Sequence, residues 1–66
     1  SDAGVGALAA RAAVSGAFLN VRINAKGYSD KNLAARLLDE GKQIEQSALQ
    51  AEAEILKRVS IQIDAE

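Results

Sequence analysis

The sequence predicts an all-α fold in which a helical hairpin forms part of a multi-helix, up-and-down bundle. Two observations support this fold class. Residues 3–25 are almost all apolar or small, without strict alternation, and alanine is the best helix former. From residue 30 onward the apolar residues recur with a period of about 3.6, which is typical of a helix with one buried face.

The first predicted element is a helix over about residues 2–26, roughly 35 Å long at 1.5 Å per residue. Ser1 or Asp2 can cap its start, and Lys26 followed by Gly27 is a stop signal. A helix that is apolar almost all the way round is normally buried. Its glycines each destabilise it by roughly 1 kcal/mol relative to alanine, which suggests that neighbouring helices approach closely there. These glycines are Gly4, Gly6 and Gly16.

A short turn over residues 27–29 is predicted to lead into a long helix over about residues 30–60. Ser29 is the expected N-cap, with Asp30 in the first turn. Gly41 is the weak point of this helix, where a kink or a close helix contact is expected. Because the second helix covers only one side of the first, we interpret residues 1–66 as a single partial domain. More chain, another subunit, or both must cover the rest.

Composition excludes several functions. The net charge of −1 argues against nucleic acid or an anionic membrane as the main partner. Without His or Cys the chain cannot build a Ser-His-Asp or Cys-His system, and we expect no metal site. The first helix is long enough to cross a membrane, but Arg11 lies near its middle and Ala and Gly are weakly hydrophobic, so we expect no span. The lack of Cys fits a reducing compartment, and we expect a cytoplasmic location.

Polar residues inside the first helix are the candidate functional residues. Asn20 and Asn24 stand on one helical face, and Arg22 points about 200° round from Asn20. Either Asn24 frays the helix end while Asn20 bonds a neighbouring backbone, or both line a ligand pocket. Arg11 has either a structural role, as a snorkelling side chain or in an ion pair elsewhere in the bundle, or a functional role in clamping an anion. Asp2 either caps the helix or binds ligand, and only an antiparallel dimer could bring it near Asn20, about 27 Å away along the helix.

The order and spacing of these residues resemble a known family. The segments are SDAGVGAL over residues 1–8 and GAFLNVRIN over residues 16–24, followed by a long helix of mixed charge. Together they resemble the C-terminal part of the formimidoyltetrahydrofolate cyclodeaminase and methenyltetrahydrofolate cyclohydrolase family. The resemblance covers nearly the whole chain, but the family domain is longer, so it implies only the last portion of that domain.

The resemblance implies an all-α bundle that dimerises and binds a reduced folate as substrate, with no separate cofactor. It implies either hydrolysis of 5,10-methenyltetrahydrofolate to 10-formyltetrahydrofolate or cyclisation of 5-formiminotetrahydrofolate with release of ammonia. The acid/base Asp of the family matches no position here, so the catalytic residues stay unknown and are expected upstream. Asn20, Asn24 and Asp2 match family positions and are expected to shape the folate pocket. Arg22 and Lys26 are candidates for attracting the carboxylates of the folate's glutamate part.

The alternative from another class is a non-catalytic helical hairpin that dimerises into a four-helix bundle. A plain hairpin would favour Leu or Ala at Asn20, so the asparagine pair distinguishes the two hypotheses. Between the two enzymes we favour the stand-alone cyclohydrolase slightly, because a bifunctional cyclodeaminase carries a transferase domain of which nothing is visible here.

Overall fold

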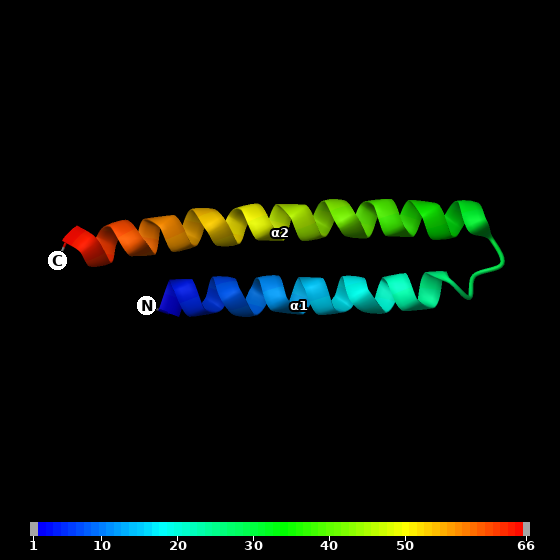
Figure 1. Ribbon diagram of the computed structural model, residues 1–66, viewed down its shortest axis with the longest axis horizontal. Helices are drawn as coiled ribbons and strands as arrows, with labels where there is room; N and C mark the ends of the chain where they lie inside the picture. Colours follow the sequence, from blue (N-terminus) through cyan, green and yellow to red (C-terminus); the bar gives the residue numbers. More distant parts are fainter. Residues whose placement is uncertain (1, 66) are drawn as a thin grey trace.

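The computed structural model describes residues 2–65, which form two antiparallel α-helices joined by a short turn (Figure 1). Helix α1 spans Asp2–Ala25 and helix α2 spans Lys31–Ala65. The hairpin is a thin rod, with extents of 56 × 14 × 9 Å. The predicted all-α hairpin is therefore confirmed. Helix α2 is the longer of the two and projects beyond the start of α1.

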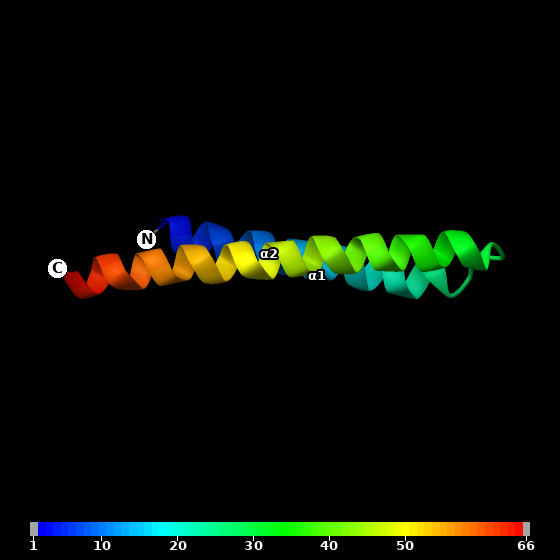
Figure 2. The same ribbon diagram turned by 90° about the horizontal axis from the view of Figure 1, so that it is seen from above.

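The two helices contact each other along a seam. On each helix the contacting residues are alternately three and four positions apart. On α1 the buried and half-buried positions that follow this spacing, here called the α1 seam, are Gly4, Ala7, Arg11, Val14, Phe18, Val21 and Ala25. On α2 the corresponding α2 seam is Ala34, Leu38, Gly41, Glu45, Ala48, Glu52, Ile55 and Val59. A 3-4 repeat is the signature of helices that cross at a shallow angle, as Figure 2 shows for this pair.

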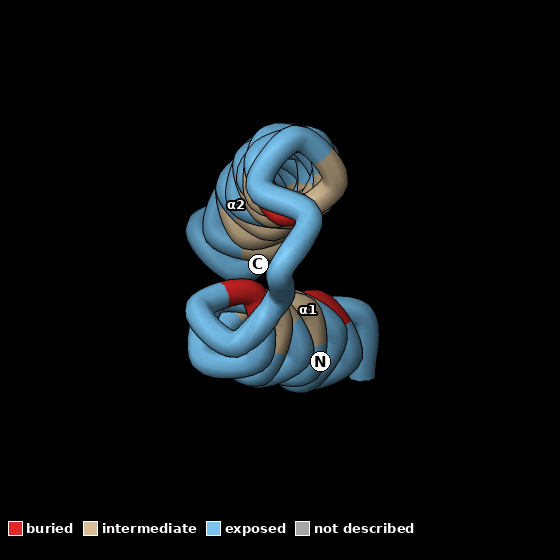
Figure 3. Tube along the Cα trace, turned by 90° about the vertical axis from the view of Figure 1, so that its right-hand side faces the viewer, coloured by how far each residue is buried: buried red, intermediate tan, exposed pale blue. Residues whose placement is uncertain are grey.

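Small residues dominate the buried part of the seam. The buried positions are Gly4, Ala7 and Ala25 on α1 and Ala34 on α2. Viewed end-on, the buried parts of the trace, in red, lie on the sides of the two helices that face each other (Figure 3). No large side chain between residues 2 and 65 is fully buried. Small residues let two helices approach closely, but they remove little apolar area from water. The hairpin thus has a narrow seam and no core of its own.

Two glycines sit at contacts between the helices. A Cβ atom added at Gly41 would lie 2.6 Å from Cδ1 of Phe18, so the ring of Phe18 packs directly against the α2 backbone. A Cβ atom at Gly4 would lie 3.7 Å from side-chain atoms of Leu56 and Val59. Of the two outcomes expected at Gly41, the structure has the close contact, because α2 continues unbroken through it.

Gly6 and Gly16 differ from this pattern, because no atom lies within 4 Å of a Cβ atom built at either position. The close approach that their sequence context predicts is not made by α2. Helix α1 also meets the length and hydropathy criteria for a membrane-spanning helix, which the interior helices of soluble bundles meet as well. The expectation that it does not span a membrane stays a prediction.

The turn differs in detail from the sequence prediction. Asp30, not Ser29, caps α2, because its Oδ1 accepts the N–H of Leu33 at 3.0 Å. Helix α1 ends at Ala25, and the N–H groups of Gly27 and Tyr28 donate to the carbonyls of Asn24 and Ala25 at 3.0 and 3.2 Å. At its other end α2 continues to Ala65, beyond the residue 60 expected from the pattern. A cap by Ser1 lies outside the described residues.

Candidate functional site

Asn20 and Asn24 lie side by side on the outer surface of α1, and we call this pair the asparagine face. Both residues are exposed. At 100° per residue Asn24 is rotated about 100° from the seam residue Ala25, and Asn20 is rotated about 100° from Val21 and about 160° from Phe18, so both lie away from α2. Neither asparagine lines any of the four hollows identified along residues 2–65. Any pocket that contains the two amides must be completed by protein outside this hairpin.

Arg22 lies on the other flank of α1. It follows Val21, so it is rotated about 100° from the seam in the direction opposite to Asn20. Asp2 is exposed at the far end of the helix, about 27 Å from Asn20 at 1.5 Å per residue. The structure therefore brings Asn20 and Asn24 together but not Arg22 or Asp2. A ligand lying along one face of α1 cannot contact the asparagine face and Arg22 of the same subunit.

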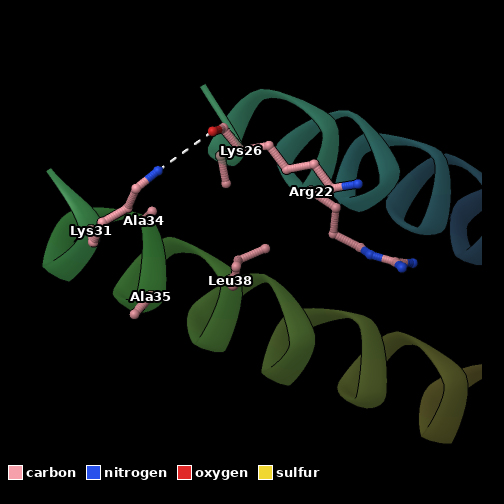
Figure 4. Close-up of a pocket in the computed structure, with 7 residues that line it drawn as sticks. Arg22, Lys26, Lys31, Ala34, Ala35 and Leu38 are labelled. Carbon is pink, nitrogen blue, oxygen red and sulfur yellow. Dashed lines mark hydrogen bonds between the residues drawn. The ribbon is translucent and has the colours of Figure 1, made fainter. Parts of the chain in front are cut away.

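Arg22 instead lines a hollow next to the turn, between the end of α1 and the start of α2 (Figure 4). The hollow has a volume of about 360 Å³. We call it the basic pocket; it is lined by Arg22, Ala25, Lys26, Lys31, Ala34, Ala35 and Leu38. Its floor is apolar and its polar groups are three cations, so its chemistry suits an anionic group attached to a carbon frame.

One hydrogen bond joins the two sides of the basic pocket, and the nearby carboxylate of Asp30 does not line it. Nζ of Lys31 donates to the carbonyl oxygen of Lys26 at 3.5 Å, which links the start of α2 to the end of α1. Asp30 precedes Lys31, but its carboxylate is engaged by the N–H of Leu33 and does not line the pocket. Among the described residues no carboxylate contributes to the lining.

Sequence reasoning missed this pocket because it depends on the register of the hairpin. Lys26 was a candidate on α1, but nothing in the sequence alone places Lys31 and Leu38 opposite it. The spacing offered one usable signal. With a turn centred near residue 28, residues 25 and 34 are close in space, so Arg22, Lys26 and Lys31 must lie at one end of the rod.

Arg11 is used structurally. Its Nε atom donates to Oε2 of Glu52 at 2.9 Å, and the two side chains are 34% and 15% exposed. Of the two readings of Arg11, the structure has the ion pair, made with the second helix of the same chain. Elsewhere, no group of three or more potential metal ligands occurs within residues 2–65.

Comparison with known proteins identifies the family of the chain. The family model described as formiminotransferase-cyclodeaminase matches residues 1–43, which carry α1, the turn and the first part of α2. The match corresponds to a C-terminal portion of that family. The searches of curated proteins and of solved structures gave no match. With about two thirds of its length matched, the chain belongs to the formiminotransferase-cyclodeaminase family, whose members are enzymes of folate metabolism.

Proposed function

We propose that the chain is part of a folate-dependent one-carbon enzyme, a methenyltetrahydrofolate cyclohydrolase or the related formiminotetrahydrofolate cyclodeaminase. The observation that carries the proposal is the family match over residues 1–43, which includes Asn20, Asn24 and Asp2. The substrate would be a reduced folate without a separate cofactor, and the enzyme would act as a cytoplasmic homodimer. The hairpin would supply one wall of the site.

The two candidate reactions determine what the hairpin residues at the site must do. In the cyclohydrolase reaction water adds to the one-carbon unit, the bond from that carbon to N5 breaks, and N5 takes up a proton. In the cyclodeaminase reaction N10 adds to the formimino carbon and ammonia leaves. Both reactions pass through a tetrahedral carbon, and amide groups that hold the ligand in place lower the barrier by orienting it. The proton-transfer group is proposed to lie in protein beyond the hairpin.

The asparagine face supports a role in binding rather than in proton transfer. An amide offers both N–H donors and a carbonyl acceptor, which suits the mixed donor and acceptor edge of a pteridine ring. Asn20 and Asn24 are one helical turn apart, so two adjacent amides can contact one planar ligand. Both are exposed on the hairpin and are free to meet a ligand or a second protein surface.

Asp2 and Arg22 fit this proposal only through a second subunit. Within one chain Asp2 lies far along α1 from Asn20, and Arg22 lies on a different side of α1. An antiparallel partner would carry its own Asp2 toward the asparagine face. That Arg22 and Lys26 attract the carboxylates of the folate stays a prediction, and it also requires a second subunit.

The non-catalytic dimerisation hairpin is the second candidate. The observation that favours it is the apolar outer surface of α1, where Val5, Leu19 and Ile23 are 67%, 52% and 60% exposed. This surface needs cover under either proposal. The asparagine face is needed only under the first, so it supplies the test.

The test is binding of 5-formyltetrahydrofolate, a stable reduced folate, to the intact protein by titration calorimetry. Asn20→Leu should weaken binding about tenfold, because a hydrogen bond to a ligand is worth about 1–1.5 kcal/mol. Asn32→Leu is the matched control, since Asn32 is also exposed but lies in the first turn of α2. Equal affinities of the parent and the Asn20 variant would remove the site assignment. If the intact protein turned over neither folate substrate, the enzyme proposal would be wrong.

A further inference from the structure

The basic pocket concentrates three cations at the turn end of the rod. Arg22 and Lys26 are four residues apart, so they are neighbours on one face of α1, and Lys31 approaches them from the start of α2. Like charges at this spacing oppose helix formation. The cations of α1 gain from their position at the negative end of the helix dipole, but Lys31 lies in the first turn of α2, where the dipole opposes a positive charge.

The arrangement leaves excess positive charge at the pocket. No carboxylate of the described residues lines the pocket, and the carboxylate of Asp30, which caps α2 beside Lys31, can offset only one of the three cations. The carboxylate of Asp30 already complements the positive end of the α2 dipole, so the excess charge comes from the three side chains. An anion bound here would reduce the repulsion among them.

The apolar floor narrows the class of anion. Ala25, Ala34, Ala35 and Leu38 line the pocket beneath the cations, and the side chain of Leu38 points toward α1 in Figure 4. Inorganic phosphate would leave this floor in contact with water. A carbon frame of a few methylene groups would cover it while its carboxylates pair with the lining cations.

We propose that the basic pocket binds a small organic dicarboxylate, whose carboxylates pair with Arg22, Lys26 and Lys31 and whose methylene groups rest on Leu38. This proposal is an alternative to the attraction of the folate's carboxylates by Arg22 and Lys26, and the site lies on the flank of α1 that faces away from the asparagine face. A ligand in the basic pocket does not displace one on Asn20 and Asn24 of the same subunit.

The experiment is a titration of the isotope-labelled intact protein with glutarate at constant ionic strength, followed by NMR shifts of the Ala34 and Leu38 methyl groups. Butyrate and inorganic phosphate are the comparison probes. Lys26→Gln and Lys31→Gln should each weaken glutarate binding about two- to fivefold, as expected for exposed charge pairs. Lys57→Gln makes the same charge change on an exposed residue of α2 outside the pocket, and should leave binding unchanged.

Each probe can overturn the proposal. Equal weakening by Lys57→Gln would mean that only net charge attracts the ligand. If phosphate bound as tightly as glutarate, the apolar contact would not contribute to binding. If butyrate bound as tightly, the second carboxylate would not contribute. Either result would contradict the proposal. Displacement of glutarate by 5-formyltetrahydrofolate would assign the pocket to the folate site instead. Glutarate shifts that persist unchanged with the reduced folate bound, and that fall in both pocket variants, are the expected result.

Discussion

The two helices have the same kind of seam but opposite outer surfaces. Beyond its seam α2 carries mostly charged and amide side chains, whereas α1 carries mostly alanine, glycine and larger apolar residues. Helix α2 therefore has only one face that must be buried against another helix. Helix α1 has the surface of an interior helix but is covered by α2 on one side only. The difference therefore predicts further neighbours for α1.

The outer surface of α1 provides the largest test of this difference. Leu19→Glu should weaken association of the chain with a second copy or with further protein by about 100-fold. The change removes a large apolar side chain, worth about 1.5–3 kcal/mol when buried, and places a charge at the contact. Sedimentation velocity over a range of concentrations measures the effect.

The matched control is Ile44→Glu on α2. Ile44 is 60% exposed, slightly more than Leu19, but its surroundings include the polar residues Glu40, Gln43 and Ser47. We expect association to change less than threefold, because α2 has no continuous apolar surface there. If both variants weakened association equally, or if the parent chain were a folded monomer, α1 would not be the helix that lacks cover.

The two glycines Gly41 and Gly16 test the same difference inside the 66-residue chain. Gly41→Ala should destabilise it by about 1–2 kcal/mol, because the new methyl group overlaps the ring of Phe18 and the strain exceeds the gain in helix propensity. Gly16→Ala should instead stabilise the chain by up to about 1 kcal/mol, because nothing lies near the new atom. Thermal unfolding followed by circular dichroism distinguishes the two signs.

The sign at Gly16 also reports on the missing neighbours. In an assembly where another helix covers α1, Gly16→Ala should become neutral or destabilising, while the effect at Gly41 should not change. A stabilising effect at Gly16 in both the chain and the intact protein would contradict an interior position for that side of α1.

The hairpin was predictable because each of its features depends on local sequence. Three features are readable without tertiary information: the almost entirely apolar or small residues over 3–25, the stop at Lys26 and Gly27, and the period of 3.6 afterwards. The errors are also local. Ser29 and Asp30 are both good caps, and only the register of the first turn decides that Asp30 accepts the N–H of Leu33.

The candidate site was less predictable because it depends on rotation about α1 and on the pairing of the helices. The shared face of Asn20 and Asn24 follows from their spacing, and so does the separation of Arg22 from them. The basic pocket does not, since it needs Lys31 and Leu38 to be placed opposite α1 by the antiparallel seam. The predicted cover of the asparagine face would come from protein outside residues 2–65, so the sequence of the hairpin does not specify it.

The two ion pairs give the smallest expected effects and compare the seam with the outer surface of α2. In a double-mutant cycle, Arg11→Ala and Glu52→Ala should show a coupling of about 1 kcal/mol, because the pair is half-buried between the helices at 2.9 Å. Glu54→Ala and Arg58→Ala should show at most about 0.3 kcal/mol, because that pair is 3.6 Å apart and its side chains are 71% and 81% exposed. Unfolding in urea measures both cycles. Raising the salt concentration should reduce the second coupling more than the first, since exposed charges are screened more strongly. Equal couplings would mean that Arg11 contributes to the hairpin only as a surface charge, and Arg11 would then be available to bind an anion.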